Sequence, residues 1–225
     1  MDLYDKVSEL GRRRGFIFPS FEIYGGVSGF YDYGPLGASL KRNIEEKWRD
    51  LFVRREGMVE IEGTIITPKP VFEASGHVSH FTDITTSCAK CGRGYRTDTL
   101  LQEAGVEVKE GMRTEELDYL IKEHDVRCPE CGGELGASES FNLMFQLSIG
   151  PYDRSIVGYG RPEAAQGQFV DFKRLFSSER DRLPLGVAQI GRCVRNEIAP
   201  RKGPIRQREF TIVDYEVFVD PEDTS

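Results

Sequence analysis

Two short cysteine pairs constrain the fold of this chain more than any other feature of its sequence. Cys88 and Cys91 lie in CAKCG, Cys128 and Cys131 lie in CPECG, and a glycine follows each pair. A tetrahedral zinc ion needs four thiolates at about 2.3 Å, and two such turns supply them from opposite sides. Glycine allows the tight backbone turn that directs amide groups at the sulfur atoms. The pattern therefore predicts a structural Zn²⁺ site, with no open position for catalysis.

Two other interpretations of the cysteines are open: redox-active pairs, and buried thiols that bind no metal. A disulfide framework is disfavoured, because residues 1–10 lack the apolar core of a secretory signal. His124 lies near Cys128, but four cysteines already complete a site. Cys193 stands apart from both pairs, and we expect it to be a small packing residue.

The cysteine pairs also mark the two ends of an expected insertion. We expect residues 87–138 to form a zinc-knuckle insertion that contains a helix from Thr114 to about His124. Residues 1–86 and 139–225 are then expected to form one main domain, which suits a chain of 225 residues.

Helical and strand patterns alternate in this main domain. Apolar residues from Leu36 to Phe52 recur at helical spacing, which predicts a long helix. Strands are expected from Val59 to Pro68 and from Phe141 to Leu147, and a helix is expected to begin at Pro162. The combination predicts an α+β fold with an antiparallel sheet and flanking helices.

The last third of the chain predicts an antiparallel pair of strands, residues 187–195 and 208–219, joined by a loop rich in Pro, Gly, Arg and Lys. Period-two alternation sorts the side chains of these strands onto two faces. The face expected to pack in the core carries Thr211, Val213, Tyr215, Val217 and Val219. The opposite face carries Arg208, Phe210, Ile212, Asp214 and Glu216, with Gln189, Gly191, Cys193 and Arg195 on the first strand. Small residues there leave room for a ligand; a plain solvent-exposed sheet face is the alternative.

The charge distribution bears on possible ligands. The net charge of −7 argues against a protein that coats nucleic acid non-specifically. Residues 192–208 are nevertheless basic, with Glu197 as the acidic exception. This stretch favours a local anionic ligand, such as a polyphosphate or one end of a nucleic acid, over the alternative of a solvated positive loop. No run approaches the roughly 20 apolar residues of a membrane span, so we expect no membrane partner and a cytoplasmic location.

Several segments resemble class II aminoacyl-tRNA synthetases. The second motif of that class has the pattern Arg-x-Glu, a variable loop, a basic residue and a phenylalanine four places on. Arg195, Glu197, Arg206 and Phe210 match it within GVAQIGRCVRNEIAPRKGPIRQREFTIVDYEVFVDP. The segments YDYGPLG, FNLMF and RPEAAQGQF resemble the glycyl-tRNA synthetases of the archaeal and eukaryotic-like type. Residues 35–68 occupy the place of the first motif, which in this class builds the dimer interface.

The resemblance implies a class II catalytic core that forms a homodimer and ligates glycine to tRNA(Gly) through glycyl adenylate. It implies that Arg195 is catalytic, holding the α-phosphate of ATP and the glycine carboxylate as they react. Arg206 then binds the outer phosphates, which Mg²⁺ neutralises, and Phe210 stacks on adenine. Glu197 contacts the adenine end or the tRNA terminus. The ATP-binding set implied by the resemblance is Arg195, Asn196, Glu197, Ile205, Arg206, Gln207 and Phe210.

Glycine offers only an ammonium and a carboxylate, so its pocket needs carboxylates and no room for a β-carbon. The resemblance gives the main ammonium contact to Glu163, with Asp214 beside it where the family usually has Glu. Glu216 lies on the same strand face. Arg96, in YRTD, resembles a family segment near the substrate. The implied glycine-binding set is Arg96, Glu163, Phe210, Asp214 and Glu216.

Class II enzymes carry a third motif and, in this family, an anticodon-binding domain. Neither pattern occurs before Ser225, so the chain is expected to be the N-terminal part of a catalytic domain. A non-catalytic synthetase-like protein that binds nucleic acid or a polymerase is the alternative. The presence of Arg195, Arg206 and Glu163 favours the enzyme, because such a protein needs no phosphate and ammonium ligands.

Overall fold

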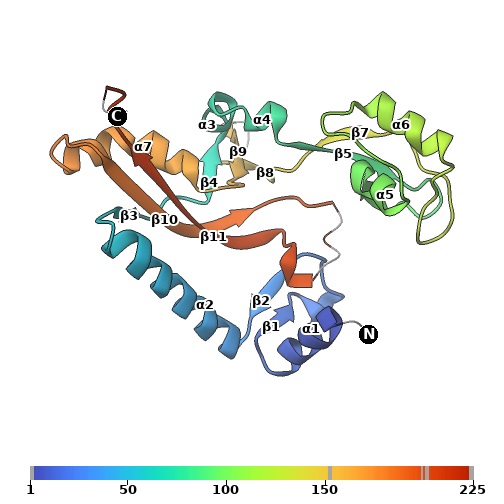
Figure 1. The fold of residues 1–225 in the computed structure, drawn as a ribbon, viewed down its shortest axis with the longest axis horizontal. Coiled ribbons are helices and arrows are strands. Elements are labelled where there is room, and N and C mark those ends of the chain that lie inside the picture. The colour runs from blue at the N-terminus through green and yellow to red at the C-terminus, as the bar shows by residue number, and fades with distance from the viewer. Residues whose placement is uncertain (1–2, 152–153, 199, 201–202, 223–225) are drawn as a thin grey trace.

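A computed structural model describes residues 3–151, 154–198, 200 and 203–222 of the chain. The fold is mixed α+β, as predicted, with the elements arranged as in Figure 1. In the part of the chain that the structure describes, the strands form one two-stranded and three three-stranded sheets.

The sheet at the centre of the molecule contains the two predicted long strands. β10 (Leu185–Val194) and β11 (Glu209–Phe218) pair antiparallel over their full lengths. The short strand β3 (Val59–Ile61) pairs with the other edge of β10 in the parallel direction, so this sheet is mixed and not purely antiparallel.

Helices lie against both faces of this sheet (Figure 1). α7 (Ala165–Ser178) packs on one face, where the ring of Phe172 lies 4.4 Å from that of Phe218. On the other face lies α2 (Pro35–Trp48), extended by a π-helical segment η2 (Arg49–Arg54). The ring of Phe52 in η2 stacks on that of Tyr215 at 5.7 Å.

The face of β11 expected to pack in the core is exposed in this structure. Val213 is 39% exposed, Val217 is 48% exposed and Val219 is 56% exposed. Trp48 and Phe52 contact Tyr215, but they leave the valines beside it open. The alternation was read correctly, and the burial assigned to this face was wrong for the residues described.

A second sheet contains β4 (Ile66–Pro68), β9 (Ile156–Gly160) and β8 (Gln146–Ile149). Val59 to Pro68 is therefore two strands in two sheets. The chain bends between them because Gly63 is tied to Gln189 and Arg161: its N–H donates to Gln189 Oε1 at 3.0 Å, and its carbonyl accepts from Arg161. Gln189 and Arg161 are far away in sequence, so the local pattern could not predict this bend.

The predicted strand from Phe141 to Leu147 is also divided, into β7 (Glu139–Asn142) and β8. The side chain of Asn142 causes the break. Its Oδ1 accepts from the N–H of Met144 at 2.9 Å, and its Nδ2 donates to the carbonyls of His77 and Val78. These bonds hold the chain in a turn between two sheets.

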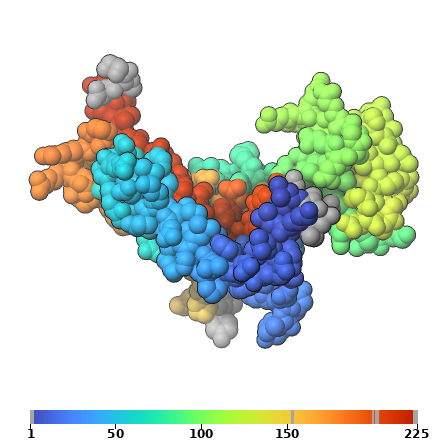
Figure 2. Space-filling view, turned by 60° about the horizontal axis from the view of Figure 1, so that its bottom comes forward, coloured from blue at the N-terminus to red at the C-terminus, as the bar shows by residue number. Residues whose placement is uncertain are grey.

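Residues around the cysteine pairs form a lobe with its own core. The lobe contains β5 (Thr82–Ser87), β6 (Gly94–Arg96), α5 (Thr97–Glu103) and α6 (Thr114–Glu123), the last matching the predicted helix. Leu101 and Leu117 are almost fully buried in that core, beside Cys88 and Cys128. Figure 2 shows the lobe standing out from the rest of the molecule.

The other described elements are short. They are α1 (Leu3–Arg13), β1 (Ile17–Pro19), η1 (Glu22–Tyr24), β2 (Tyr31–Tyr33), α3 (Lys69–Ala74), α4 (His77–His80) and η4 (Gly203–Ile205). α7 begins at Ala165, so Pro162 and Glu163 precede the helix. The expectation that the helix begins at Pro162 was wrong. None of the helices in the described ranges has the length and apolar character that crossing a membrane requires.

Candidate active site and metal centre

Arg195 lies between two aromatic rings just after β10. Its guanidinium carbon is 5.4 Å from the ring centre of Phe81 and 5.2 Å from that of Phe210. Its Nε donates to the carbonyl of Pro162 at 3.0 Å. Two cation–π contacts and one hydrogen bond fix the position of the side chain. An arginine held this way can present its other N–H groups to an anion with little further loss of entropy.

A group of carboxylates lies on the same face of the sheet. The register pairs Gln189 with Asp214 and Val187 with Glu216, which places both acids on the Arg195 face of the hairpin. Burial raises the pKa of Asp214, and repulsion by Glu163 raises it further. The pKa of Glu216 is raised by burial and then by Asp214 and Glu163. The three carboxylates thus share one negative field, which suits a cationic ligand.

Glu163 is held by one of its two carboxylate oxygens. Oε1 accepts from Gln166 Nε2 at 2.5 Å and lies 3.3 Å from His77 Nε2. Oε2 accepts no hydrogen bond from the residues that the structure describes. This oxygen is therefore available to a ligand, and the side chain that carries it is already oriented.

A buried network supports this region from below. Arg161 is 5% exposed and donates to the carbonyl of Arg192 at 2.8 Å and to Gln189 Oε1 at 2.6 Å. Gln189 is fully buried and donates to the carbonyl of Ala164 at 3.2 Å, beside Glu163. A Cβ at Gly191 would lie 1.9 Å from Nη2 of Arg161, so a side chain there would force the guanidinium to move. The network fixes the segment that carries Glu163 to β10.

Cys193 is fully buried on the same strand. Burial raises the pKa of its thiol to about 11, although Arg161 and Arg195 oppose the shift. A thiol that stays protonated near neutral pH is a poor nucleophile, which agrees with the expected packing role.

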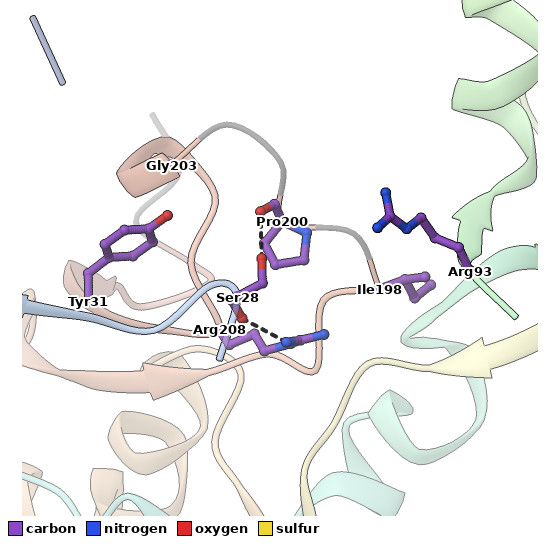
Figure 3. Close-up of a pocket in the computed structure, with 8 residues that line it drawn as sticks. Ser28, Tyr31, Arg93, Ile198, Pro200, Gly203 and Arg208 are labelled. Atoms are coloured by element: carbon purple, nitrogen blue, oxygen red, sulfur yellow. Dashed lines mark hydrogen bonds between the residues drawn. The ribbon is translucent and has the colours of Figure 1, made fainter. Parts of the chain in front are cut away.

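The loop after β10 is anchored by Arg208 (Figure 3). Its guanidinium donates to the carbonyl of Glu197 at 2.7 Å and to that of Ser28 at 2.7 Å. Ser28 Oγ in turn donates to the carbonyl of Pro200 at 3.1 Å. A cavity of about 490 Å³ lies beside these groups, with Arg93 on its far wall. Arg208 thus joins the segment around Ser28 to the loop after β10, a role that its charge alone did not indicate.

The other residues assigned to ATP differ in their surroundings. Glu197 has 14% of its side chain exposed and lies 3.9 Å from the half-exposed guanidinium of Arg206. The N–H of Asn196 donates to the carbonyl of Leu143 at 2.6 Å. Ile205 is 71% exposed, and Gln207 Nε2 donates to the carbonyl of Pro204. Arg201 and Lys202, which contribute to the basic stretch, lie outside the described residues.

Arg96 lies in β6 of the cysteine-bearing lobe. It bonds Asp98 through Nε at 3.1 Å and Nη2 at 2.6 Å, and its Nη1 is 3.2 Å from Asp83. Among the contacts of described residues, none joins Arg96 to Glu163 or to Asp214. The structure therefore does not bring Arg96 together with the carboxylate group.

The four paired cysteines come together as a possible metal site. Their sulfur atoms all lie within 4.8 Å of one another. The Sγ atoms of Cys88 and Cys131 are 3.5 Å apart, and those of Cys91 and Cys128 are 3.7 Å apart. Four thiolates around zinc at about 2.3 Å are separated by roughly 3.8 Å, so the spacing fits the ion.

Both knuckles have the same hydrogen-bonded turn. The N–H of Gly92 donates to the carbonyl of Cys88 at 2.9 Å, and that of Gly132 donates to the carbonyl of Cys128 at 2.8 Å. Both glycines have positive φ angles, 70° and 68°. This is the conformational freedom for which glycine was expected after each pair.

The surroundings of the sulfur atoms favour thiolate. Burial opposes ionisation of Cys128, but the hydroxyl of Tyr95, 3.0 Å from its Sγ, and the amides of Glu130 and Cys131 outweigh it and lower the pKa to about 6. Amide groups of Cys91 and Lys90 similarly lower the pKa of Cys88. The amide of Gly133 lowers the pKa of Cys131, but burial and then the contacts with the other three thiols raise it overall, since each thiolate that forms first opposes the next. A divalent cation removes that repulsion.

The sequence did not predict two residues that lie near the carboxylate group. Phe81 supplies one of the rings on Arg195, and His77 contacts Glu163. Their sequence separation from these partners is long, and neither has a motif spacing. A local signal for either residue is therefore lacking.

Comparison with known structures shows where a similar fold occurs. No protein-family model matches the chain. The RNA binding domain of threonyl-tRNA synthetase from Cryptosporidium parvum superposes with a TM-score of 0.54 at 19% sequence identity. The match covers 95% of this chain and 37% of that one. The fold is therefore one found in an aminoacyl-tRNA synthetase.

Sequence relatives indicate which aminoacyl-tRNA synthetases the chain resembles. Proteins named glycine–tRNA ligase are 56% identical over 224 residues in Aeropyrum pernix, 56% identical over 224 residues in Thermococcus gammatolerans and 52% identical over 221 residues in Methanocaldococcus jannaschii. These matches cover 98–99% of the chain. The chain is thus a homologue of archaeal glycine–tRNA ligases, and the resemblance inferred from its motifs is confirmed. It spans 38–39% of the length of these relatives.

Proposed function

We propose that this chain forms part of a class II enzyme that ligates glycine to tRNA(Gly) through a glycyl-adenylate intermediate. The observation that carries the proposal is one sheet face that holds both kinds of group the reaction needs. A fixed cation, Arg195, lies between Phe81 and Phe210, and three carboxylates share a field beside it. The names of the relatives support the same reaction.

Adenylate formation is in-line attack by the glycine carboxylate on the α-phosphorus of ATP, with pyrophosphate as the leaving group. Such reactions depend on positioning and charge stabilisation more than on a side-chain base. In the proposed mechanism, Arg195 holds the α-phosphate and the glycine carboxylate, and its anchoring to the carbonyl of Pro162 keeps it in place. The base of ATP stacks on the ring of Phe210.

The remaining ATP contacts come from the loop after β10. Arg206 binds the outer phosphates, and its weak, 3.9 Å pairing with Glu197 leaves its charge available. Glu197 contacts the adenine end or the tRNA terminus. Asn196, Ile205 and Gln207 line the nucleotide through backbone or side-chain contacts. Mg²⁺ neutralises the phosphates when it is bound with ATP.

The carboxylates bind the ammonium of glycine. Glu163 offers Oε2, and Asp214 and Glu216 add negative potential from the strand. Asp214 is shorter than the Glu usual in the family, so we expect its contact to be weaker or to pass through water. Arg96 is not part of this proposed pocket, because Asp83 and Asp98 already neutralise it.

A structural Zn²⁺ is proposed at Cys88, Cys91, Cys128 and Cys131, where the sulfur spacing and the lowered pKa of Cys128 fit the ion. It would stabilise the lobe and take no part in the ligation. The partners proposed for the whole enzyme are tRNA(Gly) and a second copy of the enzyme. The cytoplasm is the proposed location.

The proposal is tested by Arg195→Ala in the full-length enzyme, measured as glycine-dependent ATP–pyrophosphate exchange. Loss of one charge-assisted contact to the reacting phosphate should cost on the order of 3 kcal/mol, or about 100-fold in rate. The matched control is Arg192→Ala. Arg192 lies on the opposite face of the same strand and pairs with Glu209 at 2.6 Å.

The control should retain exchange within a few-fold of the parent enzyme. An Arg195→Ala enzyme that is as active as this control would place the reaction centre elsewhere. A folded parent enzyme without glycine-dependent exchange would favour the non-catalytic alternative.

A further inference from the structure

We propose that His77 is a positioning residue for glycine recognition, which holds Glu163 in the orientation that receives the substrate ammonium. The inference rests on the proposed function. The inference adds His77 to the proposed glycine pocket. This residue has no motif spacing and lies far from Glu163 in the sequence.

His77 reaches Glu163 from the start of α4. Its Nε2 lies 3.3 Å from Oε1 of Glu163, and its other ring nitrogen, Nδ1, lies 2.9 Å from Oγ of Ser75. Only 14% of the His77 side chain is exposed, against 32% for that of Glu163. A contact shielded from water to this degree is screened less than a surface ion pair.

The contacts of His77 assign a role to each ring nitrogen. Nε2 is the ring nitrogen nearer Glu163, and a proton on it complements the carboxylate, which can only accept. In the neutral ring Nδ1 is then an acceptor and takes the hydroxyl proton of Ser75. Ser75, His77 and Glu163 thus form a series of close polar contacts, with one ring nitrogen next to the hydroxyl and the other next to the carboxylate.

The ring itself is fixed by packing. Its centre lies 5.7 Å from that of Phe72 and 5.5 Å from that of Phe81. Asn142 donates to the carbonyl of His77 at 3.2 Å and secures the backbone. Phe81 also contacts Arg195, so one aromatic residue touches both the positioning histidine and the proposed catalytic arginine.

The consequence lies at Glu163. His77 and Gln166 both contact Oε1, so the carboxylate is held through this oxygen. Without His77, one of these two contacts is lost, and the carboxylate can turn toward Gln166 or solvent. The ammonium of glycine would then have to reorder Glu163 on binding.

The experiment compares two variants of His77 in the full-length enzyme. His77→Phe keeps an aromatic ring between Phe72 and Phe81 but removes the donor. His77→Gln loses the ring but keeps an amide donor near the position of Nε2. We expect His77→Phe to raise the KM for glycine about tenfold, the loss of one polar contact to a charged group, with the KM for ATP unchanged. His77→Gln should recover most of the glycine affinity.

A purely structural role predicts the reverse order, because His77→Gln disturbs the packing more than His77→Phe does. If His77→Phe leaves the KM for glycine unchanged, or if His77→Gln is the worse of the two, the inference is wrong. Glu163→Gln is the reference. If the KM for glycine is unchanged in Glu163→Gln, the proposed pocket itself is wrong. If the KM rises in Glu163→Gln but not in His77→Phe, only the role of His77 is wrong.

A double variant supplies the last check. If His77 acts through Glu163, adding His77→Phe to Glu163→Gln should change the KM for glycine by less than it does in the parent enzyme. Equal effects in the two backgrounds would show that His77 acts independently of Glu163.

Discussion

At the scale of single residues, the proposed glycine pocket contains acidic side chains whose charged form is destabilised by burial. Burial raises the pKa of Asp214 above 3.8, and no described residue forms an ion pair with it. Between 3.8 and the raised pKa, the folded state binds more protons than the unfolded state. The free energy of unfolding therefore falls as pH rises through this window, and the loss is complete at neutral pH.

This fall in the free energy of unfolding with rising pH gives a prediction for Asp214→Asn in the full-length enzyme. The variant should melt slightly higher than the parent at neutral pH, by about 2 °C, because an uncompensated buried charge is removed. Its KM for glycine should rise nevertheless. The difference in melting temperature should shrink as pH falls and vanish below 3.8, where Asp214 is mostly protonated even when unfolded.

Thermal melting across this pH range and glycine kinetics measure the two effects. Asp171→Asn is the control, because Asp171 is exposed on α7 and pairs with Arg174. A melting temperature that falls at neutral pH would show that Asp214 is stabilised by the fold and not strained by it. Such opposite changes in stability and binding are usual for residues selected for function.

At the scale of elements, the zinc knuckles show a short-range pattern that the sequence predicts well. Each knuckle is local, so residue type and spacing determine its turn, and the four sulfur atoms meet as the pattern requires. The strand breaks at Gly63 and Asn142 show the opposite case. They depend on Gln189 and on the carbonyls of α4, which are near only after the chain has folded.

The same distinction applies to the candidate site. The hairpin register could be predicted, because period-two alternation places Asp214, Glu216 and Phe210 on one face. The contacts of His77 and Phe81 could not, because His77 lies in α4 and Phe81 directly follows it, far from Glu163 and Arg195 in the sequence. Arg208 was recognised as basic, but its bonds to backbone carbonyls depend on how two distant loops meet.

The lobe gives the prediction at this scale. Protein purified without added zinc should contain about one zinc per chain, and Cys131→Ser should lower that content. Because the lobe has a separate core, loss of metal should increase hydrogen exchange in α5 and α6 before it affects β10 and β11. Cys193→Ser is the matched control, and this variant should retain the zinc content of the parent protein. A metal content near zero in the parent would exclude a zinc site.

At the scale of the whole molecule, the exposed apolar surface requires an explanation. Leu36 is 50% exposed, Leu40 is 49% exposed and Ile44 is 59% exposed, and a spacing of four residues places them on one side of α2. Figure 2 shows α2 at the surface. The open valines of β11 lie on the sheet face that this helix and η2 partly cover. Such a contiguous surface is unusual on a monomer and is typical of an interface.

We expect the stripe on α2 to lie in the interface of the proposed homodimer. In a two-fold dimer each interface residue is used twice, so a single substitution acts on both subunits. Leu40→Glu should therefore shift the full-length enzyme from dimer to monomer in analytical ultracentrifugation, since it places two carboxylates in an apolar contact. Arg42→Glu, a charge change twice as large on the exposed polar part of the same helix, should leave the dimer intact. If Leu40→Glu remains dimeric but melts lower than Arg42→Glu, the stripe packs against another part of the same subunit.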